Sequence, residues 1–218
     1  MAETDPLKSR YEYNRRSMRY RDRRTGQWVS TKTVKRATIK VINASKAAMR
    51  TLAQDMAGRR IKLGEWQRRM EVEIKNLHVS MAMAGAGGMA QMTPRDYGRV
   101  GARLRFEYSR LQRFAEQIKA REVTMNMIES RVDMYVSAGH ISHEAARKDQ
   151  AYDQDYKYES NVLGRTDQHC RTKDRPGCIE QTRLGRVPIG SLVPVGERQC
   201  ISRCDCSIKY HRKPKAVA

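Results

Sequence analysis

Apolar residues recur at every third or fourth position through several long stretches of the chain, which is the period of an α-helix that buries one face. The first stretch predicts a helix over about 33–57, which Gly58 would end. The second predicts a helix over about 63–85. Small residues at 84–88 then interrupt the pattern, and we interpret them as a bend. Residues 33–85 are therefore expected to form the first half of a helical body.

The third predicted helix has the clearest start. Thr93 is an N-cap candidate, Pro94 suits the first helical position and Asp96 is an acidic residue at the third. Apolar or small positions then follow in alternating steps of four and three, which is a heptad seam that would pack on another helix, in this chain or in a neighbouring subunit. The seam consists of Tyr97, Gly101, Leu104, Tyr108, Leu111, Ala115 and Ile118.

Two further helices are expected before the pattern changes. The first covers about 121–138 and would end at Gly139. Ile141 and Ser142 would then staple and cap a fifth helix that runs to about Glu159 and leads out of the body.

The two ends of the chain look different from this body. Residues 9–24 are rich in Arg and Tyr with little periodicity, so they are expected to form a basic arm, and 25–30 a turn with a short extended segment. From residue 161 helical periodicity gives way to Gly, Pro and Cys, typical of short β-hairpins. The predicted fold is mainly α: a basic arm (1–32), a helical bundle body (33–160) and a small Cys-rich, hairpin-containing module (161–218).

All five cysteines lie in this C-terminal module, which has little apolar area to bury and would need a staple. Clustered cysteines in a reducing cytosol favour a structural zinc site, although disulfides stay open because the spacing is not that of a standard zinc ribbon. Four of six candidates would ligate: His169, Cys170, Cys178, Cys200, Cys204 and Cys206. The other histidines (His78, His140, His143 and His211) form no evident ligand or triad pattern, so we do not expect an enzyme.

Charge adds a second expectation. The chain has 44 Lys and Arg against 24 Asp and Glu, a net charge of +20 that favours nucleic acid or acidic protein surfaces as partners. The basic residues are spread along the chain, and we expect no single stripe that would mark a recognition helix. The sequence shows neither a secretory signal nor an 18-residue apolar run. Candidate contacts to nucleic acid or acidic surfaces are the arm residues Arg15, Arg16, Arg19, Arg21, Arg23 and Arg24.

Two segments of the C-terminal module resemble the Cys/His signature of tailed-bacteriophage minor head, or head-morphogenesis, proteins. They are Asn161-x-Leu163-Gly164-x2-Asp167-x-His169-Cys170 and Gly196-x3-Cys200-x3-Cys204-x-Cys206-x3-Tyr210. The chain departs from that signature at Lys173, where a second cysteine would follow His-Cys; Cys178 would replace it at a wider spacing.

The resemblance implies a virion structural protein and no enzymatic activity. Such a protein is assembled in the host cytoplasm in several copies, as a minor head, capsid-associated or head–tail connector component. Its partners would be capsid, portal or tail-adaptor proteins, with packaged double-stranded DNA as a further contact. The alternative is a zinc-containing nucleic-acid-binding protein. A metal-dependent hydrolase is disfavoured because the sequence shows no paired-carboxylate or His-rich constellation.

Overall fold

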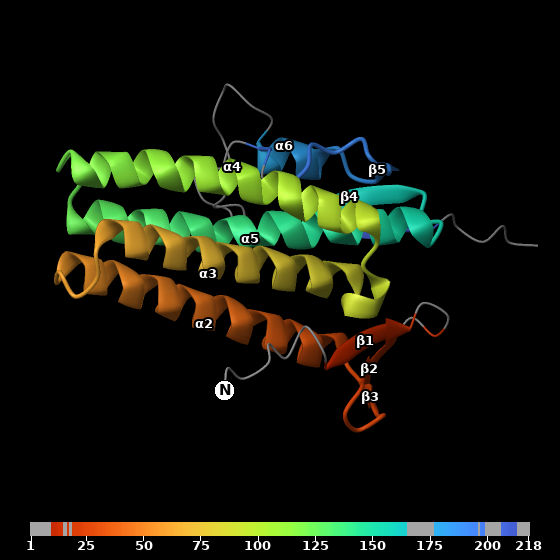
Figure 1. The fold of residues 1–218 in the computed structure, drawn as a ribbon. Helices are drawn as coiled ribbons and strands as arrows, with labels where there is room; N and C mark the ends of the chain where they lie inside the picture. Colours follow the sequence, from red (N-terminus) through yellow and green to blue (C-terminus); the bar gives the residue numbers. More distant parts are fainter. Residues whose placement is uncertain are drawn as a thin grey trace, which may run out of the picture.

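Four long helices packed side by side form the body of the protein (Figure 1). The computed structural model describes residues 10–14, 17, 19–164, 177–195, 197–198 and 206–212. Helices α3 and α5 make the most extensive contact, and α2 and α4 flank this central pair. The predicted mainly α fold is confirmed. The long helices are α2 (Thr31–Ala57), α3 (Leu63–Ala86), α4 (Pro94–Lys119) and α5 (Met125–Asp153), and a short 3-10 turn, η1 (Met89–Gln91), precedes α4.

The bundle core is built from the apolar faces that the helical period predicts. Trp66 of α3 is fully buried, and its ring centroid lies 6.4 Å from that of Phe114 on α4. The seam on α4 packs inside the chain, through buried Leu111 and Ala115 and their half-buried neighbours. Tyr97, however, is 47% exposed, so the seam begins after it.

The predicted start of α4 is a complete capping box. The hydroxyl of Thr93 accepts a hydrogen bond from the backbone N of Asp96 (3.3 Å), and the Asp96 carboxylate accepts one from the backbone N of Thr93 (2.8 Å). Asp96 is buried, so these bonds are shielded from water. They satisfy two of the backbone donors that a helix start leaves without an intrahelical partner.

We expect Thr93→Ala to lower the free energy of unfolding by about 1 kcal/mol, the usual cost of losing an N-cap side chain. Urea titration measures it. The matched control is Thr51→Ala, an exposed Thr inside α2, which should change stability by less than about 0.5 kcal/mol. Equal losses in both variants would show that the cap contributes nothing specific.

The expected helix break at Gly139 is wrong, because α5 continues through it to Asp153. Gly139 is buried against α3, where a Cβ would lie 2.9 Å from Cγ of Leu77. The glycine therefore permits close packing of two helices instead of ending one. Ser142, expected to be a cap, lies within the same helix and forms a 2.7 Å hydrogen bond with Nδ1 of buried His78.

The expected N-terminal arm contains a small antiparallel sheet. Its strands are β1 (Tyr11–Asn14), β2 (Arg19–Asp22) and β3 (Trp28–Val29), in the order β1-β2-β3. The sheet lies at the end of α3, where the backbone N of Tyr13 donates to the carbonyl of Gly87 (2.6 Å). Gly88, at φ 123°, lies so close to β1 that a Cβ there would be 2.7 Å from the Tyr11 carbonyl oxygen. The small-residue run thus ends α3 and seats this sheet.

A second antiparallel sheet lies in the C-terminal part, with strand order β5-β4-β6. Its central strand covers residues for which we expected the end of a helix, and it spans the expected boundary at residue 160. None of the described helices combines the length and apolar character needed to cross a membrane. The elements of this part are β4 (Tyr158–Val162), α6 (Cys178–Arg183), β5 (Val187–Pro188) and β6 (Ser207–His211).

Candidate functional site

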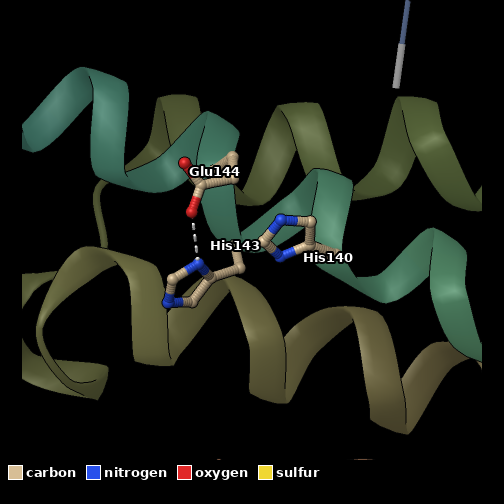
Figure 2. Close-up of side chains that lie close together, drawn as sticks. All are labelled: His140, His143 and Glu144. Carbon is tan, nitrogen blue, oxygen red and sulfur yellow. Dashed lines mark hydrogen bonds and ion pairs between the residues drawn. The ribbon is translucent and has the colours of Figure 1, made fainter. Parts of the chain in front are cut away.

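A cluster of polar side chains on α5 faces the C-terminal sheet. His140, His143, Glu144 and Arg147 follow at spacings of three, one and three, so they share one side of the helix. Figure 2 shows three of them, with the bond between His143 and Glu144 dashed. They border a cavity of about 920 Å³ that is also lined by the N-terminal sheet, α2, the end of α3 and β6.

Glu144 is the centre of this cluster. Its carboxylate accepts hydrogen bonds from Nδ1 of His143 (3.0 Å) and from Arg147 (3.1 and 3.3 Å). It also accepts one from the backbone N of Ile208 on β6 (3.1 Å). Because an ionised carboxylate only accepts, Nδ1 of His143 carries the proton in this bond. One buried side chain therefore joins two of its own helix neighbours to the C-terminal sheet.

His140 makes a second bond to the same strand region. Its Nε2 lies 2.7 Å from the carbonyl oxygen of Cys206. A carbonyl can only accept, so Nε2 carries the proton in the bonded tautomer. His140 and Glu144, one helical turn apart, thus hold residues 206 and 208 of the C-terminal part. We call these two contacts the α5 latch.

The electrostatics of the latch favour an ionised Glu144. Burial opposes its ionisation, but the hydrogen bond from His143 and the charge of Arg147 outweigh that cost and lower the pKa of Glu144 to about 2. Burial lowers the pKa of His143, which keeps its imidazole neutral at pH 7. The result is a carboxylate–guanidinium pair bridged to a neutral histidine.

His140, His143 and Glu144 place one potential ligand atom each within 4.8 Å of one another. Two of the histidines for which we expected no ligand pattern are thus brought together with Glu144, and their spacing on one helix was the signal that the sequence offered. Their chemistry fits a cation poorly, however. Arg147 already neutralises the carboxylate, and His140 and Glu144 are engaged by the backbone of the C-terminal part. The arrangement is suited to docking that part on the bundle.

The structure describes two of the six predicted ligands. Cys178 starts α6 and Cys206 precedes β6, and both are buried in one apolar cluster with Leu192, Val195 and Ile208. No disulfide joins these two cysteines to each other. The remaining candidates lie outside the described residues: His169, Cys170, Cys200 and Cys204.

A fully buried arginine lies beside this cysteine cluster. Arg198 donates from Nη1 to the side-chain oxygen of Asn161 (2.6 Å) and from Nε to the carbonyl of Val193 (2.8 Å), and Nη1 lies 4.0 Å from the sulfur of Cys178. Among the residues that the structure describes, none accepts a hydrogen bond from its Nη2. Thiolate is the form of cysteine that binds metal, so Cys178 and Cys206 carry sulfur donors of the type that a soft-metal site uses.

The six N-terminal arginines that we predicted to contact nucleic acid or acidic surfaces differ in their surroundings. Arg15 and Arg16 lie outside the described residues. Arg19 stacks on Trp28, its guanidinium carbon 5.2 Å from the ring centroid, and Arg21 donates to the Gly26 carbonyl (2.9 Å), so both serve the small sheet. The other two described arginines of this set are exposed; they are Arg23 and Arg24.

Comparison with known proteins adds no relative to this picture: no protein-family model, curated protein or solved structure matches the chain.

Proposed function

We propose that this chain is a structural protein of a tailed-bacteriophage particle, a minor head, capsid-associated or connector component that acts by binding other virion proteins. The supporting observation is that the described residues of the resembling C-terminal segments meet in one small folded unit. Asn161 donates to the carbonyl of Cys178 (3.1 Å) and pairs with Ile208 across β4 and β6. Cys206 and Tyr210 belong to the same apolar cluster.

The attachment of this unit supports an assembly role. It is fixed to the bundle by the α5 latch and so presents a defined shape to a neighbouring subunit. The N-terminal sheet borders the same cavity from the other side. Two small sheets on a stiff helical body give separate surfaces through which capsid, portal or adaptor subunits would be contacted.

The experiment is mass spectrometry of purified virions from the phage that encodes the chain. We expect the protein in the particle at a fixed ratio to the portal subunit, retained through density-gradient purification. If the protein is found only in the host cytosol and particles form normally without its gene, the proposal fails. In that case the alternative, a zinc-containing nucleic-acid-binding protein, becomes the better interpretation.

We also propose that a structural zinc ion staples the C-terminal part, with four ligands from the six candidates. We expect protein purified in reduced form to contain about one zinc per chain by elemental analysis, since four such ligands suit one tetrahedral ion. Cys206→Ser should lose most of it, whereas exposed Ser191→Ala should keep it. A zinc-free protein whose cysteines are paired in peptide mapping would refute the zinc site.

A further inference from the structure

One side of α4 carries an arginine stripe. Its members follow at spacings of three and four, so they lie along the helix beside the buried seam, where Arg95, Phe106 and Arg113 are exposed and Arg99, Arg103 and Arg110 are half-buried. In the sequence these residues alternate with apolar and small ones, so the stripe is evident only once the buried side of α4 is known. The α4 stripe consists of Arg95, Arg99, Arg103, Phe106, Arg110 and Arg113.

The stripe has unbalanced positive charge. Arg99 pairs with Asp149 and Arg103 with Glu107, and both carboxylates are buried beneath it. Within the described part of the chain, Arg95, Arg110 and Arg113 make no ion pair. Burial and the neighbouring charge of Arg95 lower the pKa of Arg99, as expected where guanidinium groups are crowded. An anion lying along the helix would relieve this repulsion.

The other long helices cover only part of this side. The helix packs on α3 and, over a smaller area, on α5, and it flanks the central pair on the side away from α2 (Figure 1). From residue 95 to residue 113 the stripe extends about 27 Å, at about 1.5 Å per residue. Arg131 of α5 adds a further cation nearby, with its guanidinium carbon 4.9 Å from the ring centroid of Phe114 on α4.

The aromatic residue in the stripe helps to identify the partner. Phe106 is 49% exposed, and the guanidinium carbons of Arg103 and Arg110 lie 5.1 and 5.4 Å from its ring centroid. The ring thus orients two cations and is poorly placed to stack a base, which disfavours single-stranded nucleic acid. A single exposed aromatic also falls short of the apolar centre that a protein interface uses.

We propose that the α4 stripe binds the phosphate backbone of double-stranded DNA without reading its sequence. A row of guanidinium groups over about 27 Å matches the repeated phosphates of a duplex. Arginines that bind these phosphates release the counterions condensed on the DNA, and this release favours binding. The contact surface is then α4, and the N-terminal arginines contribute less. This proposal concerns only the purified chain and DNA, so its test is independent of the virion proposal.

The experiment is fluorescence anisotropy of the full chain with a labelled duplex of about 30 base pairs, titrated over a range of salt concentrations. The test variant is Arg95→Gln/Arg110→Gln/Arg113→Gln. The matched control is Lys32→Gln/Arg36→Gln/Lys40→Gln, which removes the same charge from exposed positions on α2. Circular dichroism melting confirms that both variants fold.

We expect the stripe variant to bind at least about tenfold more weakly at about 100 mM salt, and its salt slope to fall by about 3, near 0.9 per lost phosphate contact. The α2 control should change affinity by less than about threefold, and Arg95→Lys/Arg110→Lys/Arg113→Lys should keep most of the binding. Equal losses of DNA affinity in both glutamine variants would show that binding depends only on net charge, and this result would overturn the proposal. Tighter binding to single-stranded DNA or to an acidic polypeptide would overturn it in favour of that partner.

Discussion

Replacing Gly85 with alanine should lower the free energy of unfolding by about 3 kcal/mol, the upper part of the usual range for overpacking a tight core. An alanine Cβ at this position of α3 would lie 2.2 Å from the carbonyl oxygen of His143 on α5 and 3.1 Å from the Cβ of Ala146. The nearest atom belongs to helix backbone, so relief requires the two central helices to move apart. Urea unfolding measures the loss.

Gly101→Ala is the matched control for this prediction. Gly101 also lies inside a long helix, but apart from its chain neighbours and its own helix backbone, no atom of the described residues lies within 4 Å of a Cβ built there. Alanine is the better helix former, so this variant should be more stable by roughly 0.5–1 kcal/mol. If both variants gain stability, the close contact between α3 and α5 does not limit the packing of the bundle.

The helical body could be predicted because its signals are local. The period of apolar residues located α2, α3 and α4 to within two residues at their starts, and the Thr93–Asp96 box is visible as a string of letters. Burial of the seam against another helix follows from the same period, but the period leaves open whether that helix belongs to the same chain. What the period leaves open is the identity of the facing helix, since the partner of a seam is a property of tertiary packing.

Gly139 shows why α5 was predicted as two helices. A glycine near a helix end is a common stop, and the sequence alone does not reveal that Leu77 occupies the space beside it. Placing a break there separated His140, His143 and Glu144 from the preceding helix and hid their common side. The first two N-terminal strands were missed for a different reason: they are short, and they pair at the end of α3, which a local pattern does not show. The short extended segment expected within 25–30 is β3.

The candidate site likewise has a part that the sequence could predict and a part that it could not. Cysteine spacing indicated a compact C-terminal unit, and Cys178 and Cys206 do share one apolar cluster. The latch that holds this unit was not predictable, because two of its four partners are backbone atoms, the carbonyl of Cys206 and the N–H of Ile208. Every residue carries these groups, so only the fold determines which ones meet a side chain.

Glu144→Gln should lower the free energy of unfolding by about 3 kcal/mol at pH 7, near the lower end of the cost of breaking a buried ion pair. Glutamine keeps the shape of the side chain but leaves Arg147 without a counter-charge and weakens the acceptor for the N–H of Ile208. Urea unfolding gives the global loss. Hydrogen exchange at the Ile208 amide, expected to accelerate, shows that the C-terminal sheet has loosened on α5.

The dependence on pH separates charge from shape in this variant. The pKa of Glu144 falls from an ordinary 4.5 to about 2 on folding, so the unfolded chain takes up this proton first as the pH falls. The contribution of the Glu144 carboxylate to the free energy of unfolding is complete above about pH 4.5 and is lost as the pH falls toward about 2. The stability gap between the wild type and Glu144→Gln should therefore narrow through that window, while Glu116→Gln, an exposed carboxylate on α4, should match the wild type throughout. A gap that stays constant from pH 7 to pH 3 would mean that the carboxylate charge does not hold the latch.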